Sequence, residues 1–280
     1  MNHQISQVRS FDNTRLFVQT WFPEKDCKAS ICLVHGIGEH SSRYHEWAEQ
    51  FAEQGFAIVS YDQRGHGLSE GKRGVISSYD DFMQDIDVML DYTNNLFPNA
   101  TSFLYGHSMG GGEVLHHLTN RKTNYLGVIS TSPWIISQEA PPKFLLPIIR
   151  AFNKVIPSFS ITTSFNAKLL SHDKQVWKKY EEDELIHHRI SFRLFIDAYD
   201  AGCALLKNTK SLQKPLLLLH GNADEITDCH ASKLFADSVG NNCTHIQYDK
   251  AYHELHHEFC KQQVFQDILS WINAQLEQNH

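Results

Sequence analysis

Uninterrupted apolar runs alternate with amphipathic segments along most of the chain. Apolar runs of roughly four to eight residues are typical of strands covered on both faces, and apolar residues at helical spacing predict helices packed against such strands. The strands are expected at residues 29–34, 56–61, 101–107, 125–131, 215–220 and 243–248, and the helices at residues 42–54, 79–96, 109–120, 230–238 and in the last twenty or so residues. Such alternation predicts an α/β fold with a mainly parallel sheet and helices on both faces.

Two more strands are expected before this alternation begins. Residues 4–11 and 14–22 are separated by Asp12-Asn13, which is a good turn pair, and apolar and polar positions alternate in the second segment. These two strands predict an entry hairpin.

The alternation stops at Ser132-Pro133 and resumes near residue 207. Helical patterns recur at residues 174–182 and 189–206, and no convincing strand is found between 133 and 206. Prolines stand at positions 133, 141, 142, 147 and 157. We therefore expect a core formed by residues 1–132 and 207–280, and a helical cap inserted as residues 133–206.

Aliphatic and aromatic residues are concentrated in the cap between residues 144 and 156, around a helix that proline is expected to kink. Three roles are open for this surface: packing of the cap onto the core, lining of an apolar mouth, or transient contact with a membrane surface. For the second role, the candidate substrate-binding residues are Phe144, Ile148 and Phe152.

Composition excludes several classes of partner. The net charge of −7 and the absence of a lysine-rich segment give no footprint for nucleic acid. We find neither a signal-peptide pattern nor a run of about 18 apolar residues, and the six cysteines are scattered, as in a reduced cytoplasmic protein. The expected location is the cytoplasm, with peripheral membrane contact as an option. No His-Glu-x-x-His or Cys/His metal pattern is recognised among the 18 histidines, which are interpreted as surface residues, and neither a metal nor a cofactor is expected.

The segment 103–112 carries the candidate nucleophile. It contains Gly-x-Ser-x-Gly centred on Ser108, with an apolar strand before it and a helical pattern after it. A sharp strand-to-helix turn holds a serine hydroxyl exposed, and Gly106 and Gly110 allow the close backbone approach that this turn needs. In this context the motif predicts a nucleophilic serine.

An acid and a base follow Ser108 in chain order, each in a loop after an expected strand. Asp224 follows residues 215–220, and His253 follows residues 243–248. The order Ser, acid, His is that of the triad in α/β-hydrolases, in which the histidine removes the serine proton and the acid orients the imidazole. We prefer His253 to His245, which lies within the strand, and to His256 and His257, which approach the last helix.

Two glycine-rich loops follow the first two buried strands. The first, residues 35–40, is either a plain strand-helix loop or a source of free backbone N–H groups. In the second case the N–H groups of Ile37 and Met109 are the expected oxyanion hole. The second, residues 62–74, lacks the Gly-Lys-Ser/Thr ending of a phosphate-binding loop and is interpreted as support for the first.

The chain resembles the monoacylglycerol lipase and lysophospholipase group of serine α/β-hydrolases. The resemblance covers nearly all of the chain outside the cap. It is carried by His35-Gly-Ile-Gly-Glu-His-Ser-Ser-Arg-Tyr44, Asp62-Gln-Arg-Gly-His-Gly-Leu-Ser-Glu-Gly71, Gly106-His-Ser-Met-Gly-Gly111, His220-Gly-Asn-Ala-Asp224 and Tyr252-His253-Glu-Leu. It implies an eight-stranded sheet, a lid over an acyl-chain tunnel and the site residues Ser108, Asp224, His253, Ile37 and Met109. Glu113, His116 and His117 depart from the small or apolar residues usual in the nucleophile helix.

The leading hypothesis is a cofactor-free carboxylester hydrolase that acts on a single-chain lipid ester through an acyl-enzyme. A small-ester carboxylesterase, a thioesterase and an aminopeptidase of the same fold are the alternatives among enzymes. A lipid-binding module without catalytic activity is the alternative from another class. An activated serine would separate the enzymes from such a module.

Overall fold

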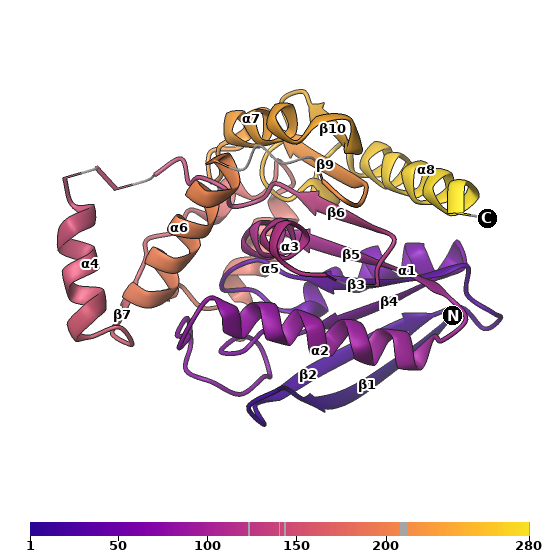
Figure 1. The fold of residues 1–280 in the computed structure, drawn as a ribbon, viewed down its shortest axis with the longest axis horizontal. Helices are drawn as coiled ribbons and strands as arrows, with labels where there is room; N and C mark the ends of the chain where they lie inside the picture. Colours follow the sequence, from indigo (N-terminus) through magenta and orange to yellow (C-terminus); the bar gives the residue numbers. More distant parts are fainter. Residues whose placement is uncertain (123, 140, 143, 208–211, 280) are drawn as a thin grey trace.

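The computed structural model describes residues 1–122, 124–139, 141–142, 144–207 and 212–279. An eight-stranded sheet runs through the molecule in the order β1-β2-β4-β3-β5-β6-β9-β10 (Figure 1). The strands are β1 (Asn2–Arg9), β2 (Arg15–Phe22), β3 (Ala29–Val34), β4 (Phe56–Tyr61), β5 (Thr101–His107), β6 (Gly127–Thr131), β9 (Leu216–Gly221) and β10 (Cys243–Tyr248). β2 runs antiparallel to β1 and β4, and every other neighbouring pair is parallel. The predicted entry hairpin and mainly parallel sheet are confirmed.

Helices cover both faces of the sheet because each central strand is apolar on both sides. In β3, Ile31 and Leu33 belong to the core that α1 and α8 complete, whereas Cys32 and Val34 belong to the core that α2, α3 and α7 complete. These helices are α1 (His45–Glu53), α2 (Asp80–Leu96), α3 (Met109–Asn120), α7 (Cys229–Val239) and α8 (Lys261–Asn279). Their bounds agree with the predicted segments to within a few residues. No helix among the described residues is long and apolar enough to cross a bilayer.

The segment between β6 and β9 forms a separate group of short elements. It contains α4 (Leu146–Val155), β7 (Ser160–Thr162), the 3₁₀ turn η2 (Ala167–Leu169), α5 (Lys174–Glu182), β8 (Arg189–Ser191) and α6 (Phe192–Lys207). β7 and β8 pair antiparallel, so the expectation of no strand in this segment is wrong. Three-residue strands are too short to produce a recognisable alternation. The expected boundary at 207 adjoins residues 208–211, which lie outside the described residues.

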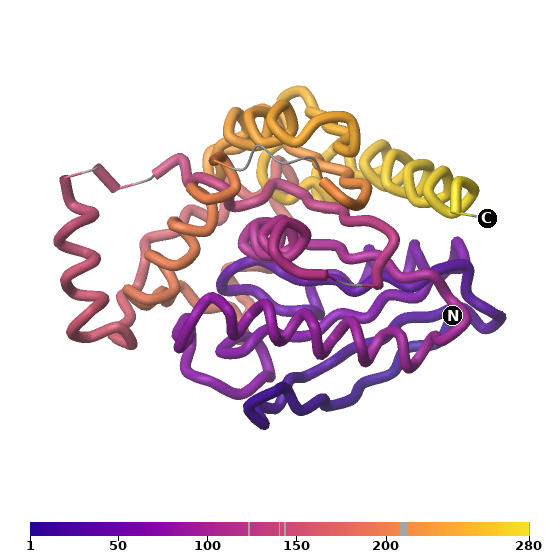
Figure 2. Tube along the Cα trace, viewed as in Figure 1, coloured from indigo at the N-terminus to yellow at the C-terminus, as the bar shows by residue number. Residues whose placement is uncertain are grey.

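α4 and α6 pack differently. α6 packs on α3 and α7 of the core, whereas α4 packs on α6 and lies at the outer edge of the molecule, as the tube in Figure 2 also shows. Pro147 stands in the first turn of α4, where its missing N–H removes no helical hydrogen bond. The expectation that proline kinks this helix is therefore wrong, because Pro147 opens the helix instead.

Two of the three unusual polar residues of α3, Glu113 and His117, are buried, and His116 is half-buried. His117 bonds through Nε2 to Asp87, 2.9 Å away. Glu113 is fully buried, and neither of its carboxyl oxygens has a hydrogen-bond partner among the described residues. Burial, reinforced by the nearby Asp85, raises the pKa of Glu113 well above its ordinary value. Burial in the nucleophile helix therefore favours the protonated form of this carboxyl.

Candidate active site

Ser108 occupies a sharp turn between β5 and α3. Its φ of 56° and ψ of −117° form a strained backbone conformation for a residue that carries a Cβ. The turn requires glycine at positions 106 and 110, where the backbone is too close for a side chain. A Cβ on Gly106 would lie 2.2 Å from the carbonyl oxygen of Gly110, and a Cβ on Gly110 would lie 2.4 Å from the carbonyl oxygen of Val34. The predicted strand-turn-helix setting of Ser108 is confirmed.

The structure brings Ser108, His253 and Asp224 together in one chain of hydrogen bonds. The Oγ of Ser108 lies 2.9 Å from Nε2 of His253, and Nδ1 of His253 lies 2.7 Å from Oδ2 of Asp224. All three are buried residues at the carboxyl ends of β5, β9 and β10. This arrangement allows the imidazole to accept the serine proton while the carboxylate holds its other nitrogen.

Hydrogen bonds from several directions fix the Asp224 carboxylate. Its Oδ1 accepts from the backbone N–H groups of Ile226 and Thr227 at 2.8 and 3.1 Å, and its Oδ2 lies 3.1 Å from Nε2 of His220. Burial alone would raise the pKa of Asp224, but the facing His253 and the hydrogen bond from His220 lower the pKa well below its ordinary value. Asp224 is therefore ionised. Sequence reasoning missed the role of His220, although it is the last residue but one of β9, the strand that precedes Asp224.

The environment of His253 acts on its basicity in two directions. Burial lowers the pKa of His253, whereas the Asp224 carboxylate, and then Glu254 and Glu39, raise it, and the net effect is a pKa above the ordinary value of 6.5. Next to it, burial and the proximity of His253 lower the pKa of His107 to about 4. His253 is thus the basic imidazole of this pair.

The loop after β3 closely approaches Ser108. A Cβ on Gly36 would lie 3.0 Å from the Cβ of Ser108, and Ile37 lines the same cavity as Ser108. Met109 is the first residue of α3, and the N–H groups of a first helical turn have no partner within the helix. The two candidate oxyanion donors therefore come from the two segments that flank Ser108.

A buried ionic network connects this loop with the loop that carries His253. Arg43 bonds to both carboxylate oxygens of Glu254, at 2.5 and 2.9 Å, and to Glu39 at 2.7 Å. Glu39 in turn accepts from the backbone N–H of Gly36 at 2.5 Å. Sequence reasoning missed these three charged residues as part of the site. For Glu39 and Arg43 the available signal was their place in the segment Gly-Glu-His-Ser-Ser-Arg-Tyr, where charges follow a glycine-rich loop and precede a helix, and for Glu254 it was the position directly after His253.

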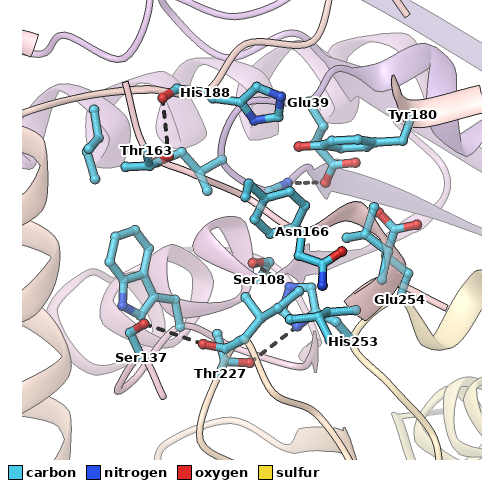
Figure 3. A pocket seen from close by; sticks show the side chains of 18 of the residues that line it. Glu39, Ser108, Ser137, Thr163, Asn166, Tyr180, His188, Thr227, His253 and Glu254 are labelled. Atoms are coloured by element: carbon cyan, nitrogen blue, oxygen red, sulfur yellow. Dashed lines mark hydrogen bonds between the residues drawn. The ribbon is translucent and has the colours of Figure 1, made fainter. Parts of the chain in front are cut away.

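A cavity of about 520 Å³ opens over Ser108 and His253, a size typical of small-molecule sites. Figure 3 shows Ser108, His253, Glu254 and Tyr180 around it. Charged and polar side chains line it, among them Glu39, Arg43, His107, Glu139, Glu225 and Glu254, and so do apolar ones, among them Trp134, Leu169, Ile190, Phe195 and Ile226. The cavity therefore has charged and apolar walls around one nucleophile.

Phe144, Ile148 and Phe152 do not line this cavity. They are 74, 51 and 47% exposed, on α4 and just before it. The expectation that they line an apolar mouth is therefore not met at this cavity, because α4 packs on α6 at the outer edge of the molecule. A sequence shows that a helix is apolar but does not show which neighbour covers it.

The loop at residues 62–74 supports the loop at 35–40, as predicted. Oδ1 of Asp62 accepts from the backbone N–H and the hydroxyl of Ser41 at 2.8 and 2.6 Å. The amide nitrogen of the Gln63 side chain donates to the carbonyl of His35 at 2.7 Å. These bonds hold the segment next to Ser108 in place.

The interpretation of the histidines as surface residues is wrong for several of them. The buried ones are His35, His40, His66, His107, His117, His220, His253 and His256. Residues 253–257 are His-Glu-Leu-His-His and match the His-Glu-x-x-His pattern of zinc-binding helices, which sequence reasoning overlooked. Here the segment forms the 3₁₀ turn η4 (Leu255–His257), and His253 is bonded to Asp224 instead.

The sheet order, the strained serine turn and the hydrogen-bonded Ser, His and Asp define an α/β-hydrolase of the serine type. A family model described as "Serine aminopeptidase, S33" matches residues 25–259, and the chain belongs to this family. The chain is 34% identical to an uncharacterized abhydrolase domain-containing protein of Dictyostelium discoideum. This match covers 99% of the chain but only 30% of the length of that relative.

Two further similarities concern lipases. A monoglyceride lipase of Rattus norvegicus is 30% identical over 95% of this chain and 89% of its own length. The crystal structure of a monoacylglycerol lipase of Paleococcus ferrophilus superimposes on this chain with a TM-score of 0.84, and the two sequences are 29% identical. The match covers 93% of this chain and 99% of that chain. These findings confirm the resemblance to the monoacylglycerol lipase group.

Proposed function

We propose that the protein is a serine carboxylester hydrolase that cleaves single-chain lipid esters, monoacylglycerols or lysophospholipids, through an acyl-enzyme on Ser108. The observation that carries the proposal is the hydrogen-bonded series Ser108, His253, Asp224 in a cavity with apolar walls. The similarity to monoglyceride lipases over nearly the whole chain supports the choice of substrate class.

In this mechanism, His253 accepts the proton of Ser108 as the hydroxyl oxygen attacks the ester carbonyl carbon. The backbone N–H groups of Ile37 and Met109 stabilise the negative charge on the carbonyl oxygen, an interaction for which loss of one donor typically costs about 10²–10³ in rate. The imidazolium then protonates the leaving alcohol, and water attacks the acyl-enzyme with His253 again as the base. Asp224 keeps the imidazole in the required tautomer throughout.

The two kinds of cavity wall suit the two ends of such a substrate. The apolar side accepts an acyl chain, and the side with Glu39, Arg43 and Glu254 offers hydrogen bonds to a polar head group. An aminopeptidase would need free carboxylates to bind a substrate ammonium group. Glu39 and Glu254 are paired with Arg43, whereas Glu139 and Glu225 also line the cavity, so an aminopeptidase substrate is kept in the test below.

A hydrolysis panel tests this function. It crosses acyl lengths from acetyl to oleoyl with glycerol and glycerophosphocholine head groups, and adds a coenzyme A thioester and an aminoacyl nitroanilide. The proposal predicts the highest kcat/KM for a long-chain monoacylglycerol or lysophospholipid. A preference for acetate esters, the thioester or the nitroanilide would replace it with the corresponding alternative.

The exposed apolar surface of the cap is the second part of the proposal. We infer that residues 144–159, which include Phe144, Val155 and Phe159 at 74, 79 and 55% exposure, contact the membrane surface in which lipid esters reside. Flotation with phosphatidylcholine vesicles tests this contact. The double variant Ile148→Ser/Phe152→Ser should bind vesicles less than the wild type, and Leu234→Ser, at an exposed position on α7, should bind equally well. Equal binding by all three would contradict it.

A further inference from the structure

Three potential metal ligands lie directly after His253. One carboxylate oxygen of Glu254 and one ring nitrogen each of His256 and His257 lie within 4.8 Å of one another. The sequence-based expectation of no metal did not consider this set, which differs from the pair His253 and His257 that a helical His-Glu-x-x-His motif would supply. The short turn η4 brings the three side chains together.

His256 is the feature that hydrogen bonding within the protein leaves unexplained. It is 3% exposed, and neither ring nitrogen has a hydrogen-bond partner among the described residues. Its ring stacks on Tyr44 at 4.7 Å between centroids and meets His107 edge-on at 5.0 Å. Imidazole always offers hydrogen-bonding or ligand nitrogen atoms, and buried polar atoms without a partner are uncommon.

The other two ligands are already in contact. Nδ1 of His257 lies 2.8 Å from Oε2 of Glu254, and the side chain of His257 is 21% exposed, which provides access from solvent. The charge around the set also suits a cation. Glu254 and Glu39 face a single guanidinium, that of Arg43, so the network carries excess negative charge.

We propose that Glu254, His256 and His257 form a binding site for a divalent transition metal ion of the zinc type, and that its occupancy inhibits ester hydrolysis. Two imidazoles and a carboxylate are a ligand set that suits Zn²⁺ or Co²⁺, with water in a fourth position. Ligand atoms around a tetrahedral ion of this size lie about 3.4 Å apart, so modest side-chain rotation closes the set.

Inhibition follows from the connection between this site and the candidate triad. The ion draws Glu254 away from Arg43, and Glu254 is covalently next to His253. The same ion adds positive charge close to the imidazole that must accept the serine proton. Both effects disfavour the hydrogen-bonded arrangement of His253 and Ser108.

Binding is measured on untagged, EDTA-treated protein by the visible absorption of added Co²⁺ and by calorimetric titration with Zn²⁺. One equivalent should bind to the wild type. His257→Ala and Glu254→Gln should each weaken binding by more than about tenfold, and the exposed His230→Ala should leave it unchanged. Melting temperatures establish that each variant is folded. Absence of stoichiometric binding, or equal affinity in His257→Ala and the wild type, would overturn the site.

The inhibitory part is tested by the rate of hydrolysis of a soluble butyrate ester with and without Zn²⁺. The rate should fall as the one-equivalent site fills and recover on chelation, and His257→Ala should need a more than about tenfold higher Zn²⁺ concentration for the same loss. An unchanged rate in metal-loaded wild-type protein contradicts this part. Cobalt binding requires no catalysis, so failure of the metal site and failure of the proposed esterase function are separate results.

Discussion

Arg43 pairs with Glu254 across 211 residues of sequence, through two nitrogen–oxygen contacts of 2.5 and 2.9 Å. Because Arg43 also bonds to Glu39, this pair connects the segment next to Ser108 with the loop of His253. Burial lowers the pKa of His253, and the Asp224 carboxylate raises it. Glu254 and Glu39, two carboxylates that share one guanidinium, add a smaller increase, and the net pKa lies above 6.5. The network therefore links the charge of the cavity wall to the basicity of the imidazole.

The pH dependence of hydrolysis follows from that raised pKa. A protonated His253 cannot accept the serine proton, so kcat/KM should rise with pH and reach half of its maximum above 6.5, the ordinary histidine value. Asp224, whose pKa is lowered, stays ionised over this range. A soluble ester assayed from about pH 5 to 9 measures the profile. Glu254→Gln should move the midpoint down, and a wild-type midpoint below 6.5 contradicts the account.

The choice among the C-terminal histidines is open to direct test. His253→Ala should lose activity by a factor of roughly 10⁴ or more, because it removes the only imidazole bonded to Ser108 among the described residues. His257→Ala and His256→Ala should retain most of the rate. His256→Ala should also melt at a lower temperature, because it leaves a cavity beside Tyr44. Loss of activity in His256→Ala or His257→Ala, together with retained activity in His253→Ala, would mean that His253 is not the base.

Chain-length preference should respond to the wall of the cavity. Leu169→Trp fills part of the apolar wall and should lower kcat/KM for oleoyl esters more than for butyrate esters. Ile148→Ser is the matched control because Ile148 lies on α4 and does not line the cavity. The control should leave the ratio of the two values unchanged on dispersed substrates. An equal effect of Leu169→Trp on both chain lengths would place the acyl chain elsewhere.

Glu113 should make stability fall as pH rises. Above the ordinary carboxyl pKa of 4.5, the unfolded chain releases the proton of Glu113 while the folded chain keeps it. The free energy of unfolding then decreases by up to about 1.4 kcal/mol per pH unit until the folded-state pKa is reached. Glu113→Gln removes this loss, so denaturant unfolding should show an advantage over the wild type that is larger at pH 8 than at pH 5.

The control for this prediction is Glu181→Gln, which changes an exposed carboxylate on α5 and should leave the pH dependence as it is. An identical pH dependence in the wild type and in Glu113→Gln would contradict a protonated buried carboxyl.

The sequence predicts the core of this fold well because its signals are local. Apolar runs such as Ile31–Val34 mark strands buried on both faces, and Gly106 and Gly110 mark the turn that exposes Ser108. The places of Asp224 and His253 follow from the rule that loops at the carboxyl ends of parallel strands meet at one edge.

The cap and the charged wall were not predictable in the same way because they depend on contacts between distant segments. Nothing local tells whether Phe152 faces a cavity or solvent. The pairing of Arg43 with Glu254 becomes visible only when residues far apart in sequence are placed together. The burial of His256, whose ring nitrogens have no hydrogen-bond partner within the described part of the chain, is likewise a property of the packing around Tyr44.

Labelling with a fluorophosphonate probe tests the central claim, an activated nucleophile at Ser108, most directly. Only a serine whose proton is removed by a neighbouring base reacts readily, and the modified peptide can be identified by mass spectrometry. The account predicts a single adduct on Ser108 in the wild type, a slowed reaction in His253→Ala, and no adduct in Ser108→Ala. The last variant should lose roughly 10⁴–10⁶ in hydrolysis rate while its circular dichroism stays native. An unlabelled wild type, an adduct on another serine, or a Ser108→Ala variant with an unchanged rate would contradict the assignment.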